Sequence, residues 1–233
     1  MRMNAQSGAR QGTGQEARNV EGSRGFSMLE IVAVLAIIFI ASGVTFVSIQ
    51  PALRNSRVNG AYDNVLTLMR VSRERAIEER KRYIVTFGTP ALTGALTPLG
   101  APNAKSIQVY RWDNGSPSPV PVQVSTIDLP SDVTFQALPG IPNNAASVPD
   151  GFGLGTTAID FDQGVGPGGG NLVMFMPDGS SHDLAGNYNN GVLYLARGTD
   201  INSSKAITIF GNAGRIRGWQ LSISGGVTSW KER

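Results

Sequence analysis

The pattern of hydrophobic and polar residues divides the chain into three parts. An apolar run from Ile31 to Ile49 contains no charged residue, and its length suits a transmembrane helix. From Pro51 to about Arg82, apolar residues recur at steps of three and four, which predicts an amphipathic helix with one face free to pack on a sheet. Beyond this helix, short β-prone runs separated by glycine and proline predict strands and turns.

The strand-rich part predicts a small antiparallel β-sandwich. The candidate strands cover residues 83–87, 107–112, 122–127, 133–137, 158–161, 172–176, 192–196, 206–210 and 215–221. Pro177-Asp178-Gly179 is a strong turn signal inside a hairpin, and we expect its role to be structural. The predicted fold class is therefore α+β, with a long N-terminal α-helix packed against the sandwich.

One carboxylate lies immediately before the apolar run. Glu30 directly precedes Ile31 and follows the segment Arg24-Gly25-Phe26-Ser27-Met28-Leu29. A charged side chain inside a bilayer costs ~2.5 to 3.5 kcal/mol on insertion scales, and such residues usually have a partner and a function. We therefore expect Glu30 to have a cationic partner.

The segment from Arg24 to Glu30, with the apolar run behind it, resembles the processing site of type IV prepilins and type II secretion pseudopilins. The resemblance implies cleavage by a prepilin peptidase between Gly25 and Phe26 and N-methylation of Phe26. It also implies that Glu30 meets the N-terminus of a neighbouring subunit during filament assembly. After cleavage the new amine would lie one helical turn from Glu30. The alternative is an uncleaved signal anchor with Glu30 at the headgroup boundary.

The charges before the apolar run predict its orientation. Four arginines, Arg2, Arg10, Arg18 and Arg24, lie on its N-terminal side, so the positive-inside rule keeps that side cytoplasmic. We expect a single-pass protein of the bacterial inner membrane with a periplasmic domain, which could also sit in an extracellular filament. The expected organisation is a cleaved leader at 1–25, an N-terminal helix at 26–82 with its transmembrane segment at 29–50, and a β-rich domain at 83–233.

The segment Leu68 to Ile77, followed by the strand Tyr83 to Phe87, is similar to the GspH/FimT family of minor pilins and pseudopilins. This resemblance implies a pilin-like fold and a subunit of a type II secretion or type IV pilus filament. Its partners would be the prepilin peptidase, other pilins or pseudopilins, and the inner membrane. Considered without the resemblance, the arginines of this segment indicate a solvated helix face.

Charge and composition narrow the functional classes. The formal charge is +3, but the arginines of the leader account for most of the excess, so overall basicity is no argument for nucleic acid binding. The chain has no cysteine, which excludes disulfides, thiol chemistry and cysteine zinc sites.

Catalytic and cofactor signals are weak, so we predict no enzyme, no cofactor and no metal. His182 is the only histidine, and its hairpin neighbours are not expected to aim at one another as a triad must. The glycines of 164–169 match a dinucleotide fingerprint, but a proline interrupts them and no helix follows. Asp160 and Asp162 could supply calcium ligands, although the ligand set is incomplete.

Arg215 and Arg217 support an alternative function. They share one face of a predicted strand, and paired arginines at that spacing can bridge phosphates. The motif Gly214-Arg215-Ile216-Arg217 resembles the C-terminal Gly-Arg-x-Arg of FimT-type minor pilins, which implies DNA binding for natural transformation. The residues that could extend such a patch or stack on bases are Lys205, Lys231, Arg233, Trp219 and Trp230. The structural alternative is an edge strand whose arginines block aggregation, and the near-neutral charge favours it.

Overall fold

A computed structural model describes residues 25–88, 104–113, 120–142, 149–152, 157–163 and 170–233. The chain divides into two compact units at Ser48/Ile49, and each is considered by itself. Apart from residues 25–27, helix α1 (Met28–Glu79) supplies the described part of the first unit, and it enters the second. It continues through Pro51 as one element, and Arg80, with a φ of 53°, ends it in the left-handed region.

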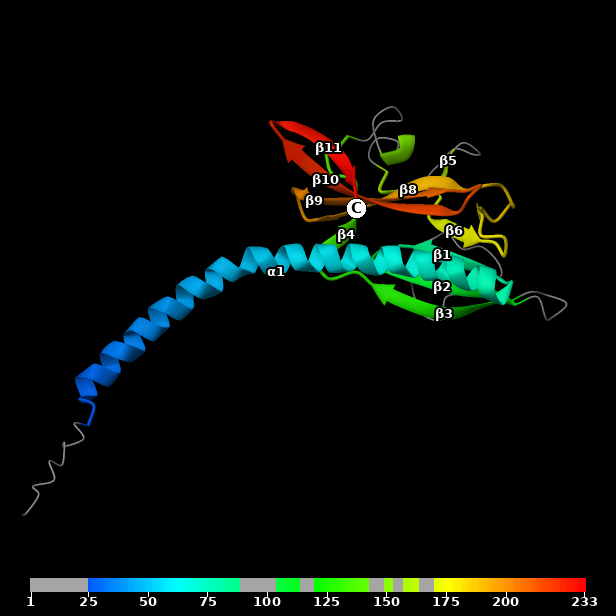
Figure 1. Cartoon of the computed structure of the whole chain (residues 1–233). Helices are drawn as coiled ribbons and strands as arrows, with labels where there is room; N and C mark the ends of the chain where they lie inside the picture. Colours follow the sequence, from blue (N-terminus) through cyan, green and yellow to red (C-terminus); the bar gives the residue numbers. More distant parts are fainter. Residues whose placement is uncertain (1–24, 89–103, 114–119, 143–148, 153–156, 164–169) are drawn as a thin grey trace, which may run out of the picture. The chain divides into compact units, whose positions relative to one another are not determined.

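The strands of the second unit form two antiparallel sheets within the described residues (Figure 1). The first sheet has the order β3-β2-β1-β6-β7, with β1 (Arg82–Phe87), β2 (Ser106–Asp113), β3 (Val120–Asp128), β6 (Leu172–Phe175) and β7 (Ser181–His182). The second has the order β11-β10-β9-β8-β4, with β4 (Val133–Phe135), β8 (Asn190–Arg197), β9 (Asp200–Phe210), β10 (Arg215–Ser224) and β11 (Val227–Glu232). Strand β5 (Ile159–Gln163) also pairs with β8, and the short 3-10 helix η1 (Pro149–Gly151) precedes it. The coarse α+β class is confirmed.

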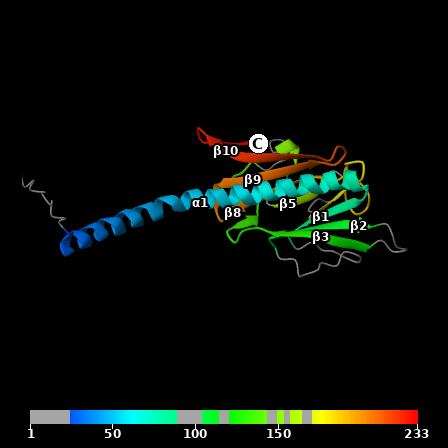
Figure 2. The same cartoon turned by 60° about the horizontal axis from the view of Figure 1, so that its bottom comes forward.

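The amphipathic part of α1 and both sheets share one hydrophobic core. In the view of Figure 2 this part of the helix runs with β9 and β10 above it and β1–β3 below it. Tyr62, Val65 and Met69 have no exposed surface and pack in the same cluster as residues of β1, β6, β8 and β9. Burial of this stripe explains the three-and-four residue period of the sequence.

Close approach of the helix to β10 requires a glycine. A Cβ on Gly218 would lie 1.8 Å from the hydroxyl oxygen of Tyr62 and 3.2 Å from Leu66. Gly218 therefore makes room for the Tyr62 ring, and any larger residue would push the helix away from the sheet.

The candidate strands of the sequence correspond to β1–β6 and β8–β10, but β7 and β11 were not predicted. Strand β11 is mostly polar and exposed, so it lacks the alternation that signals a strand. It pairs with β10 through a hairpin whose loop is Gly225-Gly226, both at positive φ. That dipeptide was the available signal for the missing strand.

Candidate functional site

The N-terminal end of α1 carries the predicted processing residues. Gly25, Phe26 and Ser27 precede the helix in a non-helical conformation, and the backbone nitrogen of Ile31 donates to the Ser27 carbonyl at 3.1 Å. Phe26 is 77% exposed, and no atom lies within 4 Å of a Cβ built on Gly25. Among the described residues nothing covers the Gly25–Phe26 peptide bond, so an enzyme could reach it. No contact with these residues requires a glycine at position 25.

Glu30 lies in the first turn of α1, where the unpaired backbone N–H groups of the helix favour a negative charge. It lines a shallow apolar groove of about 250 Å³ together with Phe26, Ile31, Val34 and Leu35. The structure thus places Phe26 and Glu30 on one face, as their spacing predicts. The described residues show no cationic side chain paired with this carboxylate.

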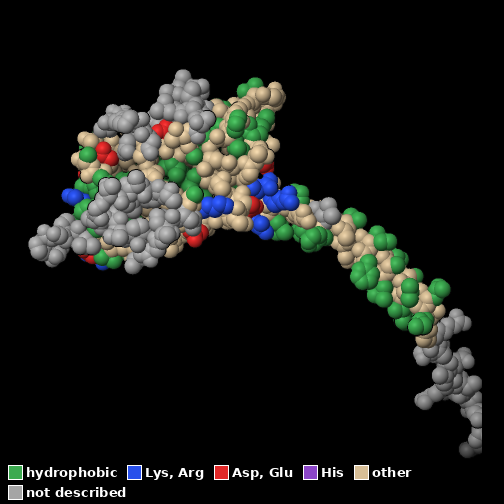
Figure 3. Space-filling view, turned by 180° about the vertical axis from the view of Figure 1, so that it is seen from behind, with side chains coloured by type: hydrophobic (Ala, Val, Ile, Leu, Met, Phe, Trp, Pro, Cys, Tyr) green, Lys and Arg blue, Asp and Glu red, His purple; other side chains and the backbone are tan. Residues whose placement is uncertain are grey.

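The first part of α1 is long and apolar enough to cross a membrane. Its large side chains are exposed, among them Phe39 at 74% and Ile40 at 69% (Figure 3). A continuous apolar surface of this kind needs a nonaqueous environment or a partner. A membrane or a bundle of similar helices would supply it.

The two arginines of the predicted phosphate site have different environments. Both side chains lie on the face of β10 opposite Ile216, which packs against the core. Arg215 is exposed and stacks over Phe210, 4.4 Å from the ring centroid. Arg217 is held by two carboxylates: its Nε donates to Glu232 at 2.7 Å and its Nη1 to Asp150 at 2.5 Å.

These ion pairs neutralise the charge that a phosphate would need. The hydrogen bonds from Arg217 lower the pKa of Glu232, because they stabilise its ionised form. The side chain of Asp150 also accepts a hydrogen bond from Thr208 on β9, so the arrangement ties η1 to the sheet. Arg217 is therefore a structural link between β10, β11 and η1 in this conformation.

The residues expected to extend the patch do not gather around it. Lys231 is directly opposite Gln220 in the sheet, so it lies on the face away from Arg215 and Arg217. Lys205 is buried and directly opposite Leu195 of the core, so it lies on the helix side of the sheet. Arg233 pairs with Asp63 at 3.4 Å. The indole N–H groups of Trp219 and Trp230 donate to Thr208 and to the Pro142 carbonyl, and both rings are half-buried, which does not suit a base-stacking platform.

Sequence reasoning missed the contacts of Arg73. The helical period placed Arg73 beside Ser72 on the face predicted to pack on the sheet, but the arginines of this segment were interpreted as solvated. The Nε of Arg73 donates to the Gly179 carbonyl at 2.9 Å, and its Nη2 donates to the Ala213 carbonyl at 3.1 Å. Arg73 thus joins α1 to two turns that are far apart in the sequence. Gly179 and Gly214 have positive φ, and a Cβ on Gly214 would lie 1.8 Å from the Gly179 carbonyl oxygen.

The hairpin around His182 contains polar side chains in contact. The Ser180 hydroxyl lies 2.9 Å from His182 Nε2 and 2.5 Å from a carboxylate oxygen of Asp178, so neighbouring residues of the hairpin do contact one another, although not in the order that a triad needs. The other ring nitrogen faces the Gly186 carbonyl at 2.8 Å rather than a carboxylate. Since Asp178 bonds to the serine and not to the imidazole, the order of a catalytic triad is absent from these contacts.

The metal and nucleotide candidates gain no support from the described residues. Asp160 is buried, the side chain of Asp162 is outside the described residues, and so is the glycine segment 164–169. In the part of the chain that the structure describes, no group of three or more His, Asp or Glu side chains could hold a metal ion.

Comparison with known proteins returns no relative. No family model matches the chain, and no curated protein or solved structure matches it either.

Proposed function

We propose that this chain is a minor pilin or pseudopilin of a type II secretion or type IV pilus filament, similar to the GspH/FimT family. The observation that carries the proposal is the combination of Gly25-Phe26 and Glu30 at the start of an exposed apolar helix. A pilin-like arrangement, in which the second part of such a helix packs on antiparallel sheets, is compatible with the core described above.

Processing would begin at the Gly25–Phe26 bond. This bond lies outside α1 and both of its residues are exposed, so a peptidase could bind it without unfolding the helix. The arginine-rich leader would stay cytoplasmic and the domain after the apolar segment would face the periplasm. The mature protein would then keep the apolar segment as its membrane anchor and begin at Phe26.

Assembly would use Glu30. The amine of a neighbour's Phe26 supplies the cation that this carboxylate lacks among the described residues, and the shallow groove beside Glu30 offers apolar contact for an aromatic side chain. In a low-dielectric environment, loss of one member of such a pair costs several kcal/mol. The pairing would therefore favour entry of the subunit into a helical bundle.

Processing is tested by co-expression with a prepilin peptidase and intact-mass measurement. We expect the loss of residues 1–25 and, after methylation, one additional methyl group on Phe26. Gly25→Leu should block cleavage, whereas Gly22→Leu, a matched change in the same leader, should leave it unchanged. An intact leader in the wild-type chain, or equal cleavage of both variants, would contradict the proposal.

Assembly is tested with Glu30→Gln, which keeps the size of the side chain and removes its charge. We expect cleavage and membrane insertion to remain, and crosslinking to partner pilins to fall strongly. Normal crosslinking of the variant would exclude a role of Glu30 in assembly.

The exposure of Arg215 favours a second candidate, weak DNA binding by a FimT-like minor pilin. Arg217 contributes little to it while Glu232 and Asp150 hold its guanidinium. If DNA binding is the function, the purified full chain should bind duplex DNA with an affinity that falls steeply with salt, and Arg215→Gln should weaken it. Arg75→Gln, a change of an exposed helix arginine, is the control. Absence of salt-sensitive binding by the wild type would exclude this function.

A further inference from the structure

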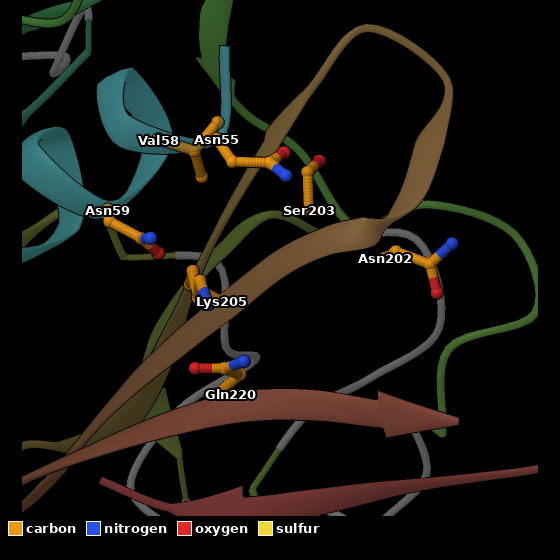
Figure 4. Close-up of a pocket in the computed structure, with 7 residues that line it drawn as sticks. All are labelled: Asn55, Val58, Asn59, Asn202, Ser203, Lys205 and Gln220. Carbon is orange, nitrogen blue, oxygen red and sulfur yellow. The ribbon is translucent and has the colours of Figure 1, made fainter. Parts of the chain in front are cut away.

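A polar pocket lies between α1 and the second sheet, within the unit that begins at Ile49. Its volume is about 160 Å³. Figure 4 shows its lining residues: Asn55, Val58 and Asn59 from α1, Asn202, Ser203 and Lys205 from β9, and Gln220 from β10. In this view the side chain of Lys205 lies between those of Asn59 and Gln220.

Lys205 is buried in this pocket without a partner. It is 4% exposed, and its ammonium group makes no hydrogen bond or ion pair with any described residue. Burial, together with a smaller contribution from nearby Arg233, lowers the pKa of Lys205 to about 8, while Asp63 acts in the opposite direction. Since Asp63 is paired with Arg233, its charge is already compensated.

The register of the strands determines that the Lys205 side chain points toward the pocket. Lys205 is directly opposite both Leu195 and Gln220 in the sheet, and opposed residues of antiparallel strands point to the same face. That face is covered by α1, so the ammonium group cannot reach the outer side of the sheet and faces the partly open pocket, where Asn55, Asn202 and Gln220 are exposed. A buried ammonium without a partner is costly, which makes an anion the natural occupant.

The other lining groups select the kind of anion. The side-chain amides of Asn55, Asn59 and Gln220 make no hydrogen bond with the described residues, so their N–H groups are available as donors. No arginine lines the pocket, and Lys205 is its one positive charge among the described residues. One cation with several neutral donors balances a single negative charge, whereas a phosphate dianion would leave an uncompensated charge in a partly desolvated site.

We propose that this pocket binds a carboxylate group, either of a small organic acid or of an acidic side chain presented by another protein. The Lys205 ammonium would pair with one carboxylate oxygen, and the amides of Asn59 and Gln220 would donate to the group from either side. The volume admits one carboxylate with a short aliphatic stem. The inference does not depend on the proposed role in a filament.

The test follows the Lys205 side chain by NMR in the full chain, held in uncharged detergent and labelled at the lysine side chains with ¹³C. Without added acid the Lys205 signal should titrate with a midpoint of about 8. Saturating acetate at constant ionic strength should raise this midpoint by about one unit, which corresponds to tenfold tighter proton binding. The Lys105 signal, from a lysine that donates to the Ser131 carbonyl, should not change.

Two variants and two further probes complete the experiment. Lys205→Met should abolish the acetate-dependent shift of the Asn59 and Gln220 side-chain amide signals, and Lys105→Met should leave it intact. A glutamate-containing peptide that saturates the site at lower concentration than acetate assigns it to a protein partner, whereas saturation by acetate alone assigns it to a small acid. No shift with either probe, an equal response to inorganic phosphate, or persistence of the shift in Lys205→Met overturns the proposal.

Discussion

Replacing Lys205 with methionine should make the protein more stable at neutral pH. Methionine has nearly the same length, so it fills the same space between α1 and β9, but it carries no charge to desolvate. Replacing a buried charged group by a hydrophobic residue of similar volume is often stabilising. The expected increase in the free energy of unfolding depends on the protonation of the lysine.

The magnitude can be worked out from the pKa of Lys205, which burial lowers from 10.5 to about 8. A shift of one unit corresponds to about 1.4 kcal/mol, so the charged lysine costs the folded state about 3 kcal/mol below pH 8. The open side of the pocket gives the ammonium some solvent, and the expected stabilisation is therefore about 1 to 3 kcal/mol.

The pH dependence identifies the cause. Between about pH 8 and pH 10.5 the unfolded lysine binds a proton that the folded lysine has lost, so the stability of the wild type should rise with pH in this interval. Burial raises the pKa of Tyr62 from 10.0 to about 12, and above pH 10 this tyrosine loses its proton first in the unfolded chain, which lowers stability. The effect of Lys205 on stability can therefore be separated from that of Tyr62 between pH 8 and pH 10. The advantage of Lys205→Met should shrink from its full value at pH 7 to less than about 1 kcal/mol at pH 10.

Denaturant unfolding of the full chain in detergent measures the effect, with tryptophan fluorescence as the signal. All three tryptophans lie in the unit that contains Lys205. Lys105→Met is the control and should change stability little at either pH, because Lys105 lies outside the pocket. Equal stabilisation by Lys205→Met at pH 7 and pH 10 would mean that packing, not charge, is responsible. Destabilisation at pH 7 would show that the lysine makes a favourable interaction, and the reasoning would be wrong.

Three further substitutions test the packing of the sheets. Gly218→Ala should destabilise by about 1 to 3 kcal/mol, because the new Cβ meets the Tyr62 hydroxyl, and Tyr62→Phe should recover part of that loss in a double-mutant cycle of unfolding free energies. Arg73→Lys should lower the melting temperature through loss of the paired hydrogen bonds to two turns, whereas Arg75→Lys should not; equal effects would contradict the role of Arg73. Glu232→Gln should make the free energy of unfolding less sensitive to acid. The pKa of Glu232 is lowered in the folded state, so its contribution to stability is present above pH 4.5 and is lost as pH falls through the lower folded value. An unchanged dependence of stability on pH below 4.5 in the variant would exclude this contribution.

Much of the architecture was predictable because it depends on local periodicity. The uncharged run before Pro51 and the three-and-four residue step after it defined α1 to within a few residues of its ends. Alternation and turn residues located most of the strands. The hairpin that adds β11 was missed because Val227–Glu232 is polar and exposed, and only its Gly225-Gly226 turn carried a signal.

The candidate sites also have some features that local sequence determined and others that depended on the tertiary structure. The spacing of Gly25, Phe26 and Glu30 is a property of consecutive residues at the start of one helix, so the sequence by itself determined their common face. The same-face spacing of Arg215 and Arg217 was also correct, but the sequence could not show that Asp150 and Glu232 would reach Arg217. Those carboxylates come from η1 and β11, and they meet the arginine only when the sheet is assembled.

The tertiary structure alone decided the environment of Arg73 and Lys205. From the sequence, the arginines around Arg73 were interpreted as solvated, and Lys205 was a possible member of a basic patch. Packing of α1 on the sheets turns Arg73 toward two distant turns and places Lys205 in a pocket beside four amide side chains. Local periodicity determines which residues share a face. What covers that face, and therefore the charge and solvent around each group, depends on contacts between elements that are far apart in the chain.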